Sequence, residues 1–334
     1  YNYLARPAYF LSVALTVAVY FIGATTNGAA RWIPVAGFQF QPSEALKVAT
    51  ILLLARRLSS CQSKIDRIRI VPSLNPFRWG RPAQRKVWRE GTRPILLPVV
   101  LSCAVIFPAH TSSAMLVFLT SLVMMLIGRV RVSELVRLVG LACAALLLAG
   151  LLNLGRSETA GGRVSTWIDL WTSSQTEKPI DRLTDTERSM IAIHNGGLLG
   201  EGAGQSAMRV EMIHPESDYA YAFFVEEYGI ILAGILLMLY LWIFFRAREI
   251  FVRCGTAFPG LLVLGLALMI TCQALLHVMV TVNLMPETGQ TLPLISRGGS
   301  SVLFTVIALG MILSVSRQND EQSHDTPRSK SIYE

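Results

Sequence analysis

The sequence predicts an all-α fold, a polytopic bundle of transmembrane helices. Only 16% of its 334 residues are charged and 52% are hydrophobic, whereas a soluble domain carries about 25% charged residues. The charge is unevenly placed, because long apolar stretches alternate with segments rich in Lys and Arg. Most of these stretches approach the roughly 17–25 residues with which a helix crosses the hydrocarbon core of a bilayer.

Eight stretches are predicted to span the membrane. Seven of them hold almost no charge: residues 7–25, 95–108, 113–128, 135–152, 230–245, 258–282 and 302–315. Another, residues 45–58, is shorter, but Glu44 and Lys47 can lengthen it at a polar edge. The chain begins at Tyr1 without Met and enters its first stretch within a few residues. We therefore expect further spans to precede it, with a complete eight-helix protein as the alternative.

Positive charge orients these helices. Lys and Arg greatly outnumber Asp and Glu between the second and third stretches, and basic residues also follow the fourth and sixth. Short basic loops stay in the cytoplasm, and all three lie on one side if the first stretch runs outward. Residues 1–317 then form the transmembrane domain, and residues 318–334 form a polar cytoplasmic tail that is predicted to be disordered. The net charge of +8 follows from this topology, so nucleic acid need not be a partner.

The external side is predicted to carry three segments, residues 27–44, 153–218 and 283–299. The large external loop 153–218 is rich in Asp and Glu, and loops of this length are usually functional or disordered. Trp167, Trp171 and the glycine-rich residues 196–204 favour ordered parts near the membrane surface. The five cysteines lie in the apolar stretches or at their inner ends. They match no metal site and are predicted to be structural thiols.

Two polar groups stand at the outer edges of the predicted helices. Ser43 is predicted to be a helix N-cap with Glu44 in the first turn, and Lys47 shares a helix face with Glu44 because the two are three residues apart. Lys47 either meets an anionic group of a ligand or forms a plain structural ion pair. Asp218 lies where the acidic loop meets an apolar helix. It is either a helix N-cap or a general base, since partial loss of water makes a carboxylate more basic.

Other polar residues within the stretches carry weaker signals. Glu226 and Glu227 lie inside the predicted membrane, and one or the other is expected to pair with an outer Arg and hold the helix in place rather than take part in chemistry. The start of the last stretch, residues 298–301, either binds an anion through exposed amides or permits close helix packing. No histidine has a second ligand at metal spacing, so four are predicted to be packing residues: His110, His194, His214 and His277.

Three external motifs resemble those of the SEDS family, named for shape, elongation, division and sporulation. The first is Asn27-Gly28-Ala29-Ala30-Arg31-Trp32-Ile33 with Phe40-Gln41-Pro42-Ser43-Glu44-x-x-Lys47. The second is Asn195-Gly196-Gly197-Leu198-Leu199-Gly200-x-Gly202-x-Gly204-Gln205-Ser206, followed by Asp218, Glu226-Glu227 and Gly229. The third is Pro286-x-Thr288-Gly289-Gln290-x-Leu292-Pro293-Leu294-Ile295-Ser296-x-Gly298-Gly299-Ser300-Ser301. The resemblance covers most of the chain and implies a SEDS-like ten-span fold that lacks its first two spans here.

By this resemblance the protein is expected to be a peptidoglycan glycosyltransferase that polymerises lipid II into glycan strands during cell division. Division-type, FtsW-like members are favoured over elongation-type, RodA-like ones. Asp218 is the expected catalytic base, and Lys47, Arg31 or Arg163 would help undecaprenyl pyrophosphate to leave. The expected substrate-binding residues are Glu44, Lys47, Arg31, Gln41, Ser43, Arg163, Gln205, Ser206, Thr288, Ser296, Gly298, Gly299 and Ser300. No protein metal site is expected, and the cofactor is either absent or a divalent cation, Mg²⁺ or Mn²⁺.

The resemblance also implies partners and a location. We expect lipid II and undecaprenyl-linked glycan as ligands, and a class B penicillin-binding protein, a single-pass transpeptidase, as partner beside other division or elongation proteins. The expected location is the bacterial cytoplasmic (inner) membrane, with the catalytic face external or periplasmic. A lipid II flippase and a non-catalytic division scaffold are the alternatives. The stretch Pro108-Ala109-His110 departs from the family pattern, because many members carry an acidic residue after Pro, and this departure leaves substrate details open.

Overall fold

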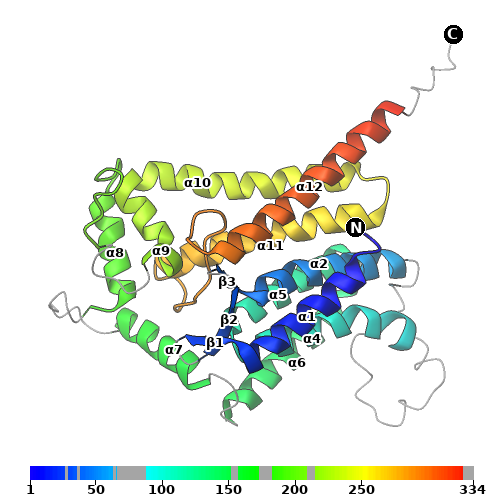
Figure 1. Ribbon diagram of the computed structural model, residues 1–334, viewed down its shortest axis with the longest axis horizontal. Helices are drawn as coiled ribbons and strands as arrows, with labels where there is room; N and C mark the ends of the chain where they lie inside the picture. Colours follow the sequence, from blue (N-terminus) through cyan, green and yellow to red (C-terminus); the bar gives the residue numbers. More distant parts are fainter. Residues whose placement is uncertain are drawn as a thin grey trace.

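The computed structural model describes residues 1–26, 29–35, 38–62, 65, 88–151, 157–172, 183–208 and 215–325. The bundle is built from α1 (Ala5–Ile22), α2 (Pro42–Cys61), α4 (Arg93–Ile106), α5 (Thr111–Ile127), α6 (Val132–Leu151), α10 (Ala220–Arg253), α11 (Ala257–Thr281) and α12 (Gly299–Asp325). Each of these helices overlaps one of the predicted membrane stretches, and together they form an elongated bundle (Figure 1). The predicted helical membrane fold is confirmed.

Hydropathy and burial separate these helices. α1, α6, α10, α11 and α12 are long and apolar enough to cross a membrane, whereas α4 and α5 are apolar but shorter. In the most apolar window of α11, 78% of the residues are buried, against 17% in α6 and in α10. A helix that is apolar on all sides must be covered by protein or by lipid. α11 is therefore a central helix, and α6 and α10 present apolar faces that a membrane would cover.

α2 lies inside the bundle in spite of its charges. It packs against α1, α4, α5 and α11, and every residue from Pro42 to Ala55 is buried. The helix begins at Pro42 with Gln41 as its N-cap, so the predicted N-cap role of Ser43 is wrong. Proline is favoured at the first helical position because its backbone is already fixed in a helical φ and its missing N–H costs nothing there. Glu44 and Lys47 are thus enclosed by protein.

Shorter elements gather at one end of the bundle, at the left of Figure 1. They are β1 (Ala24–Thr26), β2 (Ala29–Val35), β3 (Phe38–Phe40), α7 (Ser157–Thr172), α8 (Asp185–Gly196) and α9 (Pro215–Asp218). The strands form an antiparallel sheet in the order β1-β2-β3, with Thr26 opposite Ala29 and Ile33 opposite Phe40. The all-α prediction overlooked this sheet, because two of its strands have only three residues and show no alternation. Asn27 and Gly28 of the first motif lie outside the described residues.

Glycines allow the segment that follows α8, residues 197–204, to contact α10 directly through its backbone. The amide of Glu201 donates to the Glu226 carbonyl at 2.9 Å, and the Ile230 amide donates to the Gly197 carbonyl at 3.0 Å. Gly229 interrupts α10 with a φ of 80°, and a Cβ there would lie 2.3 Å from the Leu198 carbonyl oxygen. The glycine-rich run is required by this close approach of two backbones, and we call this contact the glycine joint.

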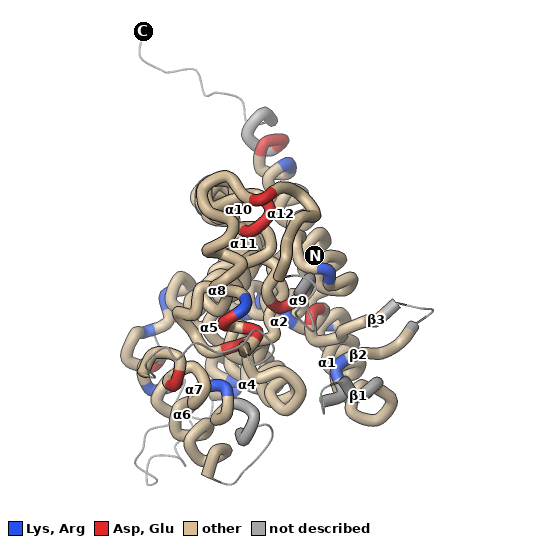
Figure 2. Tube along the Cα trace, turned by 90° about the vertical axis from the view of Figure 1, so that its left-hand side faces the viewer, with Lys and Arg blue, Asp and Glu red and all other residues tan. Residues whose placement is uncertain are grey.

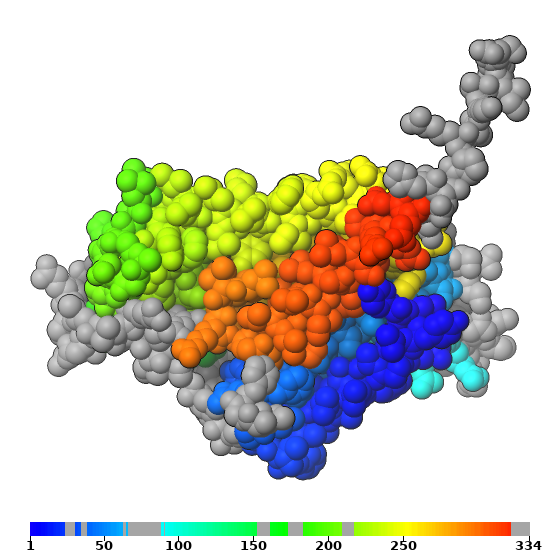
Figure 3. Space-filling view, turned by 45° about the horizontal axis from the view of Figure 1, so that its top comes forward, coloured from blue at the N-terminus to red at the C-terminus, as the bar shows by residue number. Residues whose placement is uncertain are grey.

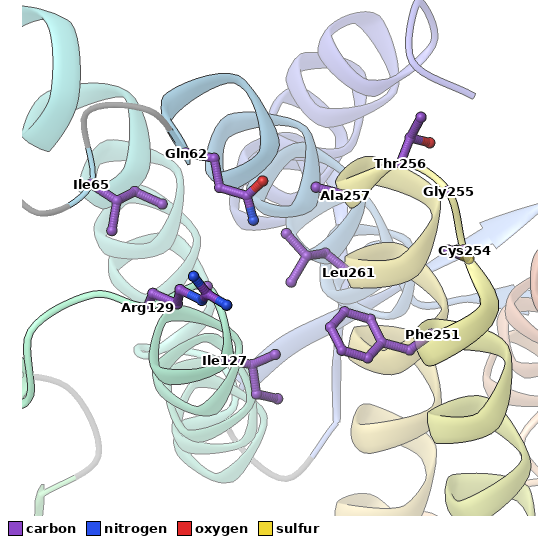
Figure 4. A pocket seen from close by; sticks show the side chains of 11 residues that line it. Gln62, Ile65, Ile127, Arg129, Phe251, Cys254, Gly255, Thr256, Ala257 and Leu261 are labelled. Carbon is purple, nitrogen blue, oxygen red and sulfur yellow. The ribbon is translucent and has the colours of Figure 1, made fainter.

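The opposite end of the bundle contains a cavity of about 550 Å³ between the ends of α2 and α5 and the turn from α10 to α11. Gln62, Arg129 and Phe251 point into it (Figure 4). None of the predicted site residues lines it.

The C-terminal tail is more ordered than predicted. α12 continues through Asp325, so the predicted disorder from Gln318 onward is wrong as far as that residue. An ion pair of 2.9 Å between Arg317 and Glu321, one helical turn apart, supports the extension. Residues 326–334, His214 and most of the predicted basic loop between the second and third spans lie outside the described residues.

Candidate active site

The segment between α11 and α12, residues 282–298, is fixed by side chains of two helices. His277 of α11 donates from Nδ1 to the Gln290 carbonyl at 2.7 Å. Tyr240 of α10 donates its hydroxyl to the Pro293 carbonyl. His277 is therefore the hydrogen-bonded packing residue that was predicted. Figure 3 shows the segment in orange on the surface of the molecule, beside α10 and continuous with α12.

His110 fixes the same segment from the start of α5, and its importance was missed. Its Nε2–H donates to the Gly289 carbonyl at 3.0 Å, so Nδ1 is the nitrogen that accepts from the Gln290 amide at 3.1 Å. Burial lowers the pKa of His110 to about 3, and the positive charges of Arg31 and Lys47 act in the same direction. His110 is consequently a neutral imidazole that fastens the backbone of the segment.

Arg31 and Asp218 meet His110 over Gly289. Arg31 lies on β2 and donates from Nε to the Ala109 carbonyl at 2.8 Å, next to His110 in the chain. A Cβ placed on Gly289 would lie 3.5 Å from His110 Nε2. The same point would lie 3.9 Å from Arg31 Nη1 and 3.9 Å from Asp218 Oδ2. Residues far apart in the sequence thus bring a carboxylate, a guanidinium and an imidazole around one small space.

Asp218 is held at the end of the one-turn helix α9. Its Oδ1 accepts a hydrogen bond of 3.0 Å from the Ser217 hydroxyl, and the Ser296 hydroxyl donates to the Ser217 carbonyl at 2.9 Å. The N-cap of α10 is Tyr219, so Asp218 does not occupy the N-cap position. The alternative of a helix cap therefore fails, and Ser296 acts here by holding α9 against the segment 282–298.

Arg163 and Glu287 add charge to the same end. Arg163 of α7 donates to the Glu287 carbonyl at 3.4 Å. Burial raises the pKa of the Glu287 carboxyl, the negative charges of Asp218 and Asp185 raise it further, and Arg163 opposes the rise. Positions of both signs lie close together beside α5, α7 and α8 when this end faces the viewer (Figure 2). The site can therefore take up both a proton and an anion.

Glu44 and Lys47 lie deeper in the bundle than the other predicted site residues. Lys47 Nζ is 2.9 Å from Glu44 Oε1 and donates to Gln273 Oε1 at 2.8 Å. The Gln273 amide in turn donates to the Thr291 carbonyl at 2.9 Å. Only 1% of Lys47 is exposed. The described contacts of this pair are those of a structural network that ties α2 to α11 and to the segment 282–298.

Gln205 and Ser206 belong to the glycine joint. Ser206 is buried and donates to Glu226 Oε2, while Gln205 is exposed. Among the described residues the carboxylate of Glu226 thus has a hydroxyl partner, where an Arg partner was predicted. A neutral donor can reach it because the glycine joint brings Ser206 directly over the buried helix face. This contact places Ser206 in the packing between the external loop and α10, whereas Gln205 lies beside it at the surface.

The start of α12 and the segment before it combine close packing with two buried hydroxyls that have no hydrogen-bond partner in the described structure. A Cβ on Gly298 would lie 3.3 Å from the Thr291 side chain, and Gly298 thus allows a tight turn. The Ser301 hydroxyl lies 2.8 Å from that of Thr291. Ser300 Oγ and Thr288 Oγ1 are buried and have no hydrogen-bond partner in the described structure. The Gly298 amide donates to the Ser296 carbonyl at 2.8 Å, so the described contacts of Gly298 are those of packing, while Gly299 is exposed.

No group of three or more His, Cys, Asp or Glu side chains in the described part of the chain could hold a metal ion. All five cysteines are free thiols. Mg²⁺ is commonly held by one or two carboxylates together with substrate phosphates.

Comparison with known proteins finds similarity over most of the chain. The FtsW/RodA/SpoVE family, described as cell cycle protein, matches residues 1–321. The chain is 29% identical over 326 residues to "Probable peptidoglycan glycosyltransferase FtsW" of Coxiella burnetii, covering 96% of this chain and 79% of that protein. It is 28% identical over 302 residues to stage V sporulation protein E of Bacillus subtilis, covering 89% and 74% of the two chains.

Solved structures share the fold. A chain of a peptidoglycan synthase complex, studied for the coordination of polymerization and crosslinking, aligns with a TM-score of 0.68 and 24% identity over 95% of this chain and 82% of that one. The rod shape determining protein RodA of Thermus thermophilus aligns with a TM-score of 0.59 and 23% identity, over 95% and 79% of the two chains.

Proposed function

The chain belongs to the FtsW/RodA/SpoVE family of cell cycle proteins, the SEDS family, and we propose that it polymerises lipid II with Asp218 as its general base. It is a multi-pass membrane protein and a peptidoglycan glycosyltransferase of cell wall synthesis. Several of its curated relatives carry the name FtsW, which supports a role in cell division.

The observation that carries the assignment of Asp218 is the convergence over Gly289. Asp218 Oδ2 and Arg31 Nη1 both lie 3.9 Å from the position of a Cβ on Gly289. A general base must come within hydrogen-bond reach of the proton that it removes. The half-buried carboxylate of Asp218 supports this role, because it lies beside Arg31 and Gly289 at the end of the bundle where residues of the three external motifs come together.

In the proposed reaction one bond to the anomeric carbon of the donor forms while another breaks. The acceptor hydroxyl transfers its proton to the Asp218 carboxylate while its oxygen forms a bond to the anomeric carbon of the lipid-linked donor. The bond from that carbon to the pyrophosphate oxygen breaks, and the electron pair leaves with undecaprenyl pyrophosphate. Positive groups fixed beside a developing negative charge stabilise it. Arg31 and Arg163 supply that charge in this proposal, and Lys47 stays within its buried network.

A divalent cation, if it takes part, is proposed to arrive with the pyrophosphate. It would supply additional positive charge for the leaving group. Asp218 and Glu287 are the carboxylates of the site that could contact it. Burial raises the pKa of Glu287, and a bound cation would favour the ionised form of that carboxyl.

The orientation and the partner also belong to the proposal. The basic loops favour a cytoplasmic location for the end opposite the site, so the site would face outward, where peptidoglycan is assembled. The similarity in fold to a chain of a peptidoglycan synthase complex supports a transpeptidase partner. We propose a class B penicillin-binding protein in this role.

The experiment uses the purified full chain, its partner transpeptidase and lipid II, with glycan strands separated on a gel. Asp218→Asn keeps the size of the side chain and removes its basicity, so strand synthesis is expected to fall about 10²–10⁴-fold. Asp169→Asn is the matched control, because Asp169 is an exposed residue of α7 at the same end. Synthesis by Asp218→Asn at the parental rate would contradict the assignment. Unmodified protein that moves lipid II between leaflets without making strands would instead be a flippase.

A further inference from the structure

The packing around Gly289 leaves room for a methyl group, so a glycine is not required at this position on steric grounds. A Cβ on Gly289 would have His110 Nε2 as its nearest neighbour, at 3.5 Å, which is an ordinary van der Waals distance. Gly289 is also absent from the glycines with positive φ. Gly200 and Gly229 differ, because both have positive φ and a Cβ on either would come within 2.3 Å of a backbone oxygen. The local backbone would therefore accept alanine at Gly289.

Polar groups surround this space on three sides. Asp218 Oδ2 and Arg31 Nη1 each lie 3.9 Å from the Cβ position, from α9 and from β2 respectively. Hydrogen bonds between oxygens have lengths of about 2.8 Å. An oxygen atom that sits about 1 Å nearer to Asp218 than the Cβ position would thus reach hydrogen-bond distance. The space has the size and the surroundings of a seat for one oxygen.

The floor of the space is held rigidly. The neutral His110 donates to the Gly289 carbonyl at 3.0 Å, and His277 donates to the Gln290 carbonyl at 2.7 Å. These two hydrogen bonds fix the backbone of the segment 282–298 at Gly289 and Gln290.

We propose that the space over Gly289 is the seat of the reacting hydroxyl of the acceptor sugar, and that His110 is the positioning residue that fixes its floor. This inference rests on the proposed function and adds the place of the nucleophile to it. Asp218 accepts the proton of that hydroxyl. The guanidinium of Arg31 favours the loss of the proton, because a nearby positive charge stabilises the negative oxygen.

Gly289→Ala tests the seat by filling it with a methyl group. A misplacement of about 1 Å costs about 10²-fold in rate, so we expect lipid II turnover to fall by about that factor while the unfolding temperature stays at or above the parental value. Gly255→Ala is the matched control, because Gly255 has no neighbour within 4 Å of its Cβ position and is not among the glycines with positive φ. Equal turnover and equal lipid II affinity in the two variants would overturn the proposal.

His110 variants test the floor and decide the question if Gly289→Ala misfolds. Glutamine can place an amide N–H where Nε2 stands and keep the bond to the Gly289 carbonyl, whereas asparagine is too short. We expect His110→Asn to lower kcat about 10–100-fold with a smaller change in KM, and His110→Gln to retain more activity. Equal losses of kcat in both variants, or a loss that follows the unfolding temperature, would overturn the positioning role.

A failure of the proposed function is recognised separately. Unmodified protein that makes no glycan strands with its partner contradicts the polymerase proposal. The affinity of Gly289→Ala and Gly255→Ala for labelled lipid II then decides the seat. Weaker binding by Gly289→Ala alone supports a sugar hydroxyl in this space, and equal binding overturns it.

Discussion

Lys47→Met separates a structural role of the buried pair from a role with substrate. Methionine has a similar length, but it cannot replace the contacts of Lys47 Nζ with Glu44 Oε1 at 2.9 Å and with Gln273 Oε1 at 2.8 Å. Glu44 is only 6% exposed and would remain as a buried carboxylate without its cation. Removing one partner of a buried ion pair costs about 3–5 kcal/mol. We expect Lys47→Met to be destabilised by about that amount.

The double variant Glu44→Gln/Lys47→Met supplies the control. It removes both charges, and neutral replacement of a whole buried pair is often close to neutral in stability. We therefore expect the double variant to recover at least half of the lost free energy of unfolding. The coupling between the two positions follows from the double-mutant cycle.

Thermal or denaturant unfolding of the purified variants measures stability, and strand synthesis per folded molecule measures activity. A structural pair predicts a large loss of stability in the single variant, with the activity of the folded fraction largely kept. Lys47→Met that keeps its stability and loses strand synthesis would refute this reasoning. Such a result would restore the substrate contact that the sequence predicted for Lys47.

Two further predictions concern topology and pH. In a cysteine-free background, a cysteine introduced within Ser157–Thr172 should react with an impermeant thiol reagent from outside and one at Gln62 should not, since basic loops stay in the cytoplasm; reversed labelling would overturn the orientation. Glu287→Gln removes a negative charge that interacts with Asp218 and favours its protonated form. We therefore expect the acidic limb of the pH–rate profile to move to lower pH. A limb at the parental pH would contradict a coupling between the two carboxyl groups.

Sequence patterns predicted the helices well, because a helix that crosses the hydrocarbon core needs a long apolar stretch, which stands out in the sequence. They placed even α2, although it carries four charged residues, since Glu44 and Lys47 could be assigned to its outer edge. The three-residue strands β1 and β3 gave no such signal. The predicted N-cap of α2 was Ser43, whereas the structure has Gln41 in that position. The difference arose because Pro42 could be interpreted either as preceding the helix or as its first residue.

The site was predicted in part. Asp218 and Arg31 were identified through the motifs and Arg163 as a possible cation for the leaving group. They lie at one end of the bundle, but their convergence there depends on contacts with residues that are distant in sequence. His110 was taken as a packing residue because its partner Gly289 is 179 positions away. The one available signal was the stretch Pro108-Ala109-His110, which departs from the family pattern of an acidic residue after Pro. Gly289 stood inside a motif, yet nothing in the sequence separates a glycine that leaves space from one such as Gly229 that allows two backbones to touch.

The glycine joint also bears on how a partner could regulate the enzyme from outside the membrane. Its contacts are backbone to backbone, with the Glu201 amide on the Glu226 carbonyl at 2.9 Å and the Ile230 amide on the Gly197 carbonyl at 3.0 Å. The Ser206 hydroxyl adds a side-chain bond to Glu226 across the same contact. α9 with Asp218 directly precedes the outer half of α10. We therefore expect a displacement of α8 to be passed on through the glycine joint to the start of α10, and with it to Asp218.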